Sequence, residues 1–155
     1  MTQFNRRHAL GLLAGTAIAS MIPAALAATG KTHITVHKTP WCGCCTKWSA
    51  HLRDAGFEVS EIKHDDLTPI KQQYGVPPMM ESCHTAVVDG YAIEGHVPAD
   101  DIKRLLEKKP DALGLAVPGM PTGSPGMEMG ESRDAYDVLL FKQDGYSVFR
   151  HYREI

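Results

Sequence analysis

Residues 33–56 read HITVHKTPWCGCCTKWSAHLRDAG, a stretch that joins a strand pattern to a helix pattern across a short turn. His33 to His37 alternates polar and apolar residues and is rich in β-branched side chains, which predicts a strand that ends at Pro40. From Thr46 to Ala55 the apolar or small residues recur at helical spacing, and Gly56 stands where a helix C-cap is expected. The stretch therefore predicts a strand-turn-helix unit whose turn carries three cysteines.

The next part of the chain continues to alternate between strand and helix patterns. These patterns predict a strand over 57–62, a helix over 68–74, a hairpin of 85–88 with 91–93, and a helix that Pro98 begins and Pro110 ends. The resulting order, β-α-β-α-β-β-α, is the thioredoxin-like order. We therefore expect an α/β fold with a thioredoxin-like mixed sheet flanked by helices.

The C-terminal part of the chain departs from this alternation. Residues 110–130 contain four prolines, five glycines and three methionines, which predicts a long irregular loop. After it, 136–142 and 146–152 flank Asp144-Gly145 and predict a terminal β-hairpin. Loops of this length are usually functional or disordered.

The N-terminus predicts export. Arg6-Arg7 precedes an apolar stretch from Ala9 to Ile22, and Ala25-Leu26-Ala27 fits a small-residue cleavage site, so 1–27 is predicted to be a cleavable signal peptide. The paired arginines resemble a twin-arginine signal, with Sec export as the alternative. An uncleaved anchor is the other alternative, although the run is short for a membrane helix. We expect a periplasmic protein with no membrane span after cleavage.

The remaining residues, 28–155, are enough for one compact domain and too few for two comfortable ones. The whole chain carries a formal net charge of −2 with its histidines neutral, and removing the signal peptide with its two arginines makes the balance more negative. Nucleic acids generally attract basic surfaces. The charge therefore argues against a nucleic-acid partner.

The four cysteines are the candidate functional residues. Cys42, Cys44 and Cys45 occupy the turn, where the positive end of the following helix favours thiolate, the form that attacks disulfides and binds metals. Helical geometry rotates Cys44 by about 100° from Cys45. Cys83 precedes the third strand, at a point that faces the active-site turn in thioredoxin-like folds. We expect the four sulfurs to converge in one pocket.

Such a pocket favours copper. Thiolates are soft ligands that suit Cu(I), zinc or iron-sulfur iron. Zinc usually takes two separated pairs of ligands, whereas a crowded Cys-x-Cys-Cys favours bridging thiolates around Cu(I). The expected ligands are Cys42, Cys44, Cys45 and Cys83, and the expected metal is Cu(I), with more than one ion as an option and zinc as the alternative.

Two alternative roles for the cysteines, neither of which involves copper, remain open. The first is a structural disulfide, Cys42 to Cys45 or Cys42 to Cys83, as exported domains often contain. The second is a thiol-disulfide oxidoreductase in which Cys42 is the nucleophile and Cys45 the resolving thiol, because Trp41-Cys42-Gly43-Cys44-Cys45 is the thioredoxin active-site string with cysteine in place of proline. A third alternative combines copper binding with thiol redox chemistry, so that the thiols exchange electrons with bound copper.

Histidine and methionine side chains are further candidates. His84, next to Cys83, could bind metal, orient a ligand, move protons or simply bond the backbone at the start of its strand. His96, before Val97-Pro98, is predicted to be a turn residue. Met120, Met127 and Met129 are predicted either to donate thioether sulfur to Cu(I) or to pack the loop onto the core.

Several motifs together are typical of one known group. They are Pro40-Trp41-Cys42-Gly43-Cys44-Cys45 with Trp48, Ser82-Cys83-His84-Thr85-Ala86, Gly95-His96-Val97-Pro98-Ala99, and Val117-Pro118-Gly119-Met120-Pro121 running into Gly123-Ser124-Pro125-Gly126-Met127-Glu128. With these segments the chain resembles small exported CopG-like copper-resistance or metal-binding proteins that have a thioredoxin-like domain. The resemblance implies copper on the four cysteines, as a small cluster, and a role in periplasmic copper handling alongside other copper-handling proteins.

Overall fold

The computed structural model describes residues 30–155, so the predicted signal peptide lies outside the described residues. The elements are, in order, β1 (His33–Lys38), α1 (Gly43–Asp54), β2 (Glu58–Lys63), α2 (Thr68–Gln73), the short 3₁₀ helix η1 (Pro78–Met80), β3 (His84–Val88), β4 (Tyr91–Glu94), α3 (Ala99–Lys108), β5 (Gly114–Ala116), β6 (Tyr136–Lys142) and β7 (Gly145–Tyr152). No helix among residues 30–155 is long and apolar enough to cross a membrane.

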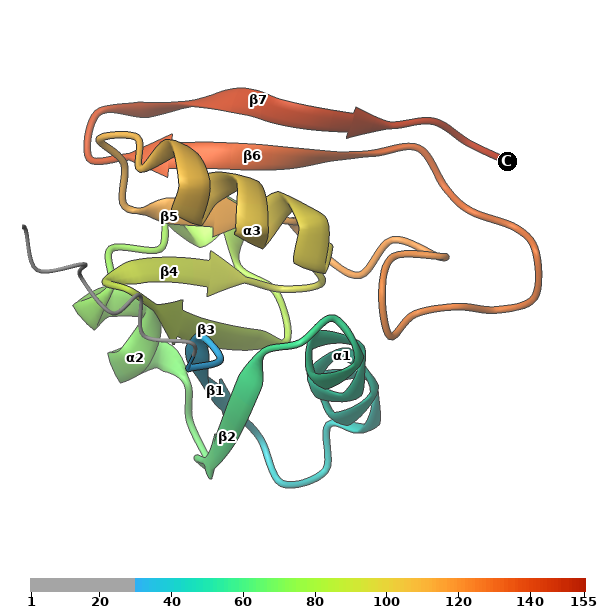
Figure 1. Ribbon diagram of the computed structural model, residues 1–155, viewed down its shortest axis with the longest axis horizontal. Coiled ribbons are helices and arrows are strands. Elements are labelled where there is room, and N and C mark those ends of the chain that lie inside the picture. The colour runs from blue at the N-terminus through green and yellow to red at the C-terminus, as the bar shows by residue number, and fades with distance from the viewer. Residues whose placement is uncertain (1–29) are drawn as a thin grey trace, which may run out of the picture.

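The strands of the described residues form one seven-stranded sheet in the order β2-β1-β3-β4-β5-β6-β7 (Figure 1). The β1–β2 and β4–β5 pairs are parallel, and the other four pairs are antiparallel. The α/β class and the mixed sheet predicted from the sequence are therefore confirmed. The terminal hairpin is confirmed as well, and it extends the sheet at its β7 edge.

Two local features differ from the sequence prediction. Helix α1 begins at Gly43 instead of Thr46, because Cys42 acts as its N-cap, with extended backbone and a sulfur that accepts from the Cys45 N–H. Strand β5 lies inside the region that was predicted to be irregular throughout. Its three residues pair with both β4 and β6, so the tertiary structure stabilises a strand that is too short to show a pattern.

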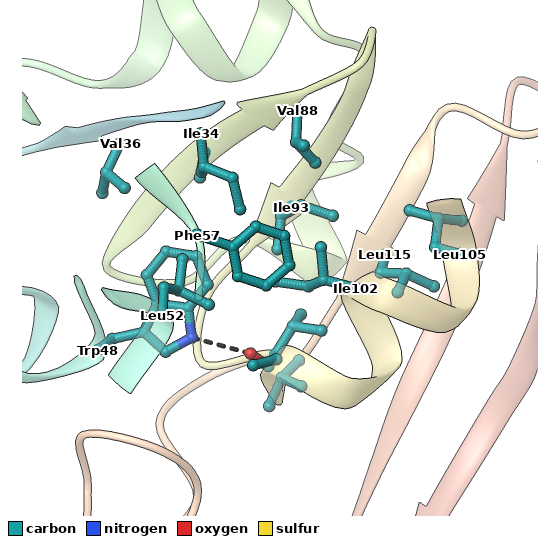
Figure 2. Close-up of a cluster of buried hydrophobic side chains, with 14 of the residues drawn as sticks. Ile34, Val36, Trp48, Leu52, Phe57, Val88, Ile93, Ile102, Leu105 and Leu115 are labelled. Carbon is teal, nitrogen blue, oxygen red and sulfur yellow. Dashed lines mark hydrogen bonds between the residues drawn. The ribbon is translucent and has the colours of Figure 1, made fainter. Parts of the chain in front are cut away.

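The main core joins α1 and α3 to one face of the sheet (Figure 2). Trp48 of α1 is fully buried in it, and the indole Nε1 donates to the backbone oxygen of Val97 at 2.9 Å, drawn as the dashed line in Figure 2. Burying a large side chain of this kind contributes about 1.5–3 kcal/mol. Because Trp48 lies three residues after Cys45, its burial also fixes the orientation of the cysteine turn.

A second, smaller core covers the opposite face of the sheet. It combines Val76 and Met80, which follow α2, with Ala92, Ala116 and Phe141 of β4, β5 and β6. The chain therefore runs from α2 through η1 along this face before it enters β3. This path brings Cys83, directly before β3, to the end of the sheet at which α1 begins.

The segment from β5 to β6 forms a long loop that extends past α3 before it returns to the sheet (Figure 1). Its tip packs on α1. A Cβ atom at Gly126 would lie 2.8 Å from the carbonyl oxygen of Cys44 and 2.8 Å from the backbone nitrogen of Trp48, and φ at Gly126 is +87°. Only glycine satisfies both the close approach and the left-handed backbone.

One histidine outside the cysteine pocket links α1 to α3. The Nε2 atom of His51 accepts a hydrogen bond from the backbone N–H of Ala99 at 3.2 Å. The first N–H groups of a helix have no partner inside the helix, so His51 caps α3. Burial lowers the pKa of His51, and the shift is opposed by the carboxylates of Glu128, Asp100 and Asp54 and supported by Lys103.

We expect the metal-free protein to lose stability as the pH falls from 7 to 5. A histidine whose pKa is lowered on folding contributes stability that is complete above its ordinary pKa and is lost as the pH falls through the lowered value. His51→Gln keeps an acceptor but does not titrate, so its unfolding free energy should fall less steeply with pH in urea titrations. Burial also lowers the pKa of His37, His84 and His96, so the slope should flatten only in part. An unchanged slope would contradict the role of His51.

Candidate metal centre

The cysteine turn lies at the N-terminus of α1. Cys42 is the N-cap, and its sulfur accepts from the backbone N–H of Cys45 at 3.3 Å. Cys42 and Cys45 form a disulfide, whereas Cys44 and Cys83 are free thiols in the described part of the chain. The C-x-x-C pair is therefore oxidised, and the extra cysteine between its members is not part of the bond.

Cys83 forms the opposite wall of the pocket. Its sulfur lies 3.8 Å from that of Cys44 and 3.6 Å from that of Cys45, while the sulfurs of Cys42 and Cys44 are 3.5 Å apart. All four sulfurs lie within 4.8 Å of one another. The structure thus brings together all four cysteines that the sequence singled out.

The side chain of Cys44 reaches the pocket although helical geometry rotates it away from that of Cys45. Cys42 lies outside the helix with extended backbone, so the helical wheel does not set its direction. Cys83 approaches from the far side of the pocket. Cys44 therefore contacts Cys42 on one side and Cys83 on the other, and it bridges the two walls of the pocket.

Two buried histidines contact Cys83. The Nδ1 atom of His84 lies 3.3 Å from the Cys83 sulfur, and the Nε2 atom of His96 lies 3.1 Å from it. Both side chains are fully buried, and burial lowers the pKa of each, so both are neutral near pH 7. Burial, together with the nearby Cys44 thiol, raises the pKa of the Cys83 thiol to about 12, so the metal-free Cys83 is protonated.

An ion pair buried under the pocket holds the backbone before Cys83. Lys71 pairs with Glu94, and its Nζ also donates to the carbonyl oxygen of Ser82 at 3.1 Å. Glu94 accepts from the Ser82 N–H at 2.6 Å and from the Thr85 hydroxyl at 2.6 Å. Both backbone groups of Ser82 are therefore fixed by buried charges, which sets the position of the next residue, Cys83.

The long loop closes another side of the pocket. The backbone oxygen of Pro125 accepts from His96 Nδ1 at 2.8 Å, and Gly126 packs on the carbonyl of Cys44. Met127 is half-buried, whereas the side chains of Met120 and Met129 are 54% and 72% exposed. The loop therefore lies at the site, but two of its three methionines are exposed to solvent.

His96 is the site residue whose role the sequence analysis missed. It was predicted to be a turn residue, and it does lie in the bend between β4 and α3, but its ring faces Cys83. The sequence indicated that His96 needs a polar partner, but not that this partner is Cys83. Residues 92–99 are apolar apart from Glu94, Gly95 and His96, and a polar side chain within a buried stretch requires a polar partner.

These features define the class of protein: an α/β domain with a mixed sheet that carries a cysteine cluster suited to a metal ion. Residues 80–127 match a family model described as "Protein of unknown function, DUF411". Two solved structures, copper resistance protein CopG Form 1 and Form 2, are each 47% identical to the chain, with a TM-score of 0.76. They cover 80% and 79% of this chain, which in turn covers 99% of each of theirs. No curated protein matches the chain significantly. The chain belongs to the CopG-like copper-resistance family.

Proposed function

We propose that this protein binds Cu(I) on Cys42, Cys44, Cys45 and Cys83, as a multinuclear thiolate cluster, and serves copper resistance or homeostasis in the periplasm. The observation that carries the proposal is the approach of all four sulfurs to within 4.8 Å of one another. Metal–sulfur bonds of about 2.3 Å allow donors at such separations to share or bridge ions. The similarity to copper resistance proteins supports copper over zinc.

The disulfide imposes a condition on this function. Cys42 and Cys45 are joined, so only Cys44 and Cys83 are thiols in this state. Two electrons and two protons convert the disulfide to two thiols, and the four-cysteine site then becomes complete. A thiol reductant is therefore needed before the full cluster can load.

Copper loading provides the direct test. The protein is reduced, separated from the reductant without oxygen and titrated with Cu(I) against a chromogenic Cu(I) chelator; protein isolated from copper-fed cells is analysed for metal in parallel. We expect more than one copper per chain and a preference for Cu(I) over zinc. Absence of copper from both samples would refute the proposal.

The domain plan belongs to the same proposal. Residues 1–27 act as a cleavable signal peptide, of the twin-arginine or the Sec type, and 28–155 form a single thioredoxin-like metal-binding domain. The order of β1, α1 and β2, followed by the β3–β4 hairpin and α3, supports the thioredoxin-like assignment. N-terminal sequencing of protein from the periplasmic fraction tests the cleavage site, which we place before Ala28.

The disulfide also favours a second candidate function. Cys42 and Cys45 are bonded at a helix N-terminus, the arrangement from which a C-x-x-C pair exchanges disulfides. Next to them, Trp41 is 73% exposed and offers an apolar surface to a substrate chain. Reduction of insulin by the metal-free dithiol protein tests this function, and lack of any turnover would count against it.

We expect Cys44→Ser to separate the two functions. Cys44 bridges the pocket through its contacts with Cys42 and Cys83 but takes no part in the disulfide. The variant should bind less copper per chain while Cys42 and Cys45 keep the redox behaviour of a dithiol. Copper stoichiometry and titration with a glutathione redox buffer measure the two properties, and equal loss of both would contradict the division of roles.

A further inference from the structure

We propose that His96 is a nitrogen ligand of the copper ion bound at Cys83, which gives the cluster a mixed sulfur–nitrogen end. The inference rests on the proposed function, since it requires copper at Cys83. It adds a donor of a different chemical class to the four sulfurs, and this donor comes from the bend between β4 and α3.

The distance between the two donor atoms fits a shared ion. His96 Nε2 lies 3.1 Å from the Cys83 sulfur. Bonds of about 2.3 Å to sulfur and about 2.0–2.1 Å to imidazole nitrogen let one ion reach two donors separated by up to about 4 Å. Because His96 is fully buried, its ring has little freedom to turn away from this position.

The loop fixes the tautomer that a ligand needs. A carbonyl oxygen can only accept, so His96 Nδ1 carries the proton that it donates to Pro125 at 2.8 Å. In the neutral ring, Nε2 then presents its lone pair to Cys83. Metal-bound histidines commonly donate their second nitrogen to a backbone carbonyl or a carboxylate, which orients the ring and raises its basicity. His96 has this arrangement before any metal binds.

His84 has a different role, although it also contacts Cys83. Its Nε2 is buried with no hydrogen-bond partner among the described residues, so a proton there would be an unpaired buried donor. The proton is better placed on Nδ1, which then donates to the Cys83 sulfur at 3.3 Å. Trp48 packs against the ring with centroids 4.3 Å apart. His84 is therefore a positioning residue that orients the sulfur, whereas His96 directs its Nε2 lone pair at the Cys83 sulfur.

Three hydrogen bonds form one directed chain, from His84 through the Cys83 sulfur and His96 to Pro125. In the metal-free protein the Cys83 S–H donates to His96 Nε2, and this thiol proton occupies the place that a copper ion takes when it binds. A copper ion that binds at this place displaces the thiol proton, which leaves to solvent, and bonds to the Cys83 sulfur and the His96 nitrogen. Imidazole suits copper in either oxidation state, whereas the sulfur-only part of the cluster favours Cu(I).

X-ray absorption at the copper edge tests the assignment. Reduced wild-type protein, His96→Gln, His84→Gln and the control His51→Gln are each loaded with Cu(I) without oxygen. We expect the outer-shell scattering that is specific to imidazole in the wild type, in His84→Gln and in His51→Gln, and its loss in His96→Gln together with a roughly tenfold weaker competition against a Cu(I) chelator. A further variant, His96→Met, should recover part of the affinity without the imidazole signal, since thioether sulfur also binds Cu(I).

Several outcomes overturn the inference. Copper bound to the wild type with scattering from sulfur alone excludes His96 as a ligand, as does an imidazole signal that persists in His96→Gln. If His96→Gln fails to fold, the wild type and His84→Gln still decide, because loss of the signal in His84→Gln assigns the ligand to His84. A wild type that binds no copper refutes the proposed function together with the inference, whereas a cluster of copper and sulfur alone refutes only the inference.

Discussion

Cys83→Ser is expected to weaken Cu(I) binding by at least about a hundredfold, which corresponds to about 2.8 kcal/mol. Cys83 is the only cysteine outside the turn, and its sulfur contacts those of Cys44 and Cys45 from the opposite wall. Without it, the remaining three sulfurs come from four successive residues and cannot enclose an ion from both sides. The change should appear both as a lower copper stoichiometry and as faster loss of copper to a chelator.

A matched control removes a soft donor outside the pocket. Met79 is four residues before Cys83 and 70% exposed, so Met79→Leu should bind copper as the wild type does. Thermal unfolding of the metal-free proteins shows whether Cys83→Ser remains folded. Wild-type copper binding by folded Cys83→Ser would remove the basis for a site that spans both walls.

Glu94→Ala is expected to destabilise the metal-free protein by about 3–5 kcal/mol, because it leaves the buried Lys71 ammonium without its partner. Domains of this size are stable by only about 5–15 kcal/mol, so the loss is a large fraction of the total. Burial raises the pKa of Glu94, and Lys71 and the hydrogen bonds from Thr85 and Ser82 oppose the shift. Urea unfolding measures the change in stability.

A double variant without either charge separates the effect of an unpaired buried charge from the loss of the ion pair. Lys71→Met combined with Glu94→Leu removes both charges and should recover much of the stability that Glu94→Ala loses. It should still bind copper less tightly, because Ser82 loses the two contacts that position Cys83. The exposed His151–Asp137 pair is the control, and Asp137→Ala should change stability little. Equal losses from Asp137→Ala and Glu94→Ala would contradict the argument.

Most of the architecture could be predicted because local pattern and tertiary structure agree. The β3–β4 hairpin turns at Asp89-Gly90, where the φ angles of 48° and 84° are ones that these two residue types adopt in such turns. Helix α3 begins directly after Pro98 and has two acidic residues in its first turn. Strand β5 could not be predicted in the same way. Its three residues gain stability only by pairing with β4 and β6.

Part of the candidate site could likewise be predicted from the sequence, and part of it could not. The convergence of Cys83 with Cys42, Cys44 and Cys45 could be predicted, because the cysteine turn and the start of the third strand meet in the expected fold. The role of His96 could not, since it depends on two contacts set by the tertiary structure: one with the Cys83 sulfur and one with the carbonyl of Pro125. No local pattern encodes a contact between residues 29 positions apart.

The close approach of Gly126 to α1 has a practical consequence for protein engineering. Surface loops can ordinarily be shortened or exchanged, but here the loop supplies the carbonyl that holds His96 and covers the backbone of Cys44. Grafting the cysteine turn alone onto another scaffold would transplant three sulfurs and leave their surroundings behind. A transplanted site must therefore include residues 117–127 as well. Gly126 contributes no ligand, but its lack of a side chain lets the loop pack directly on the backbone of Cys44.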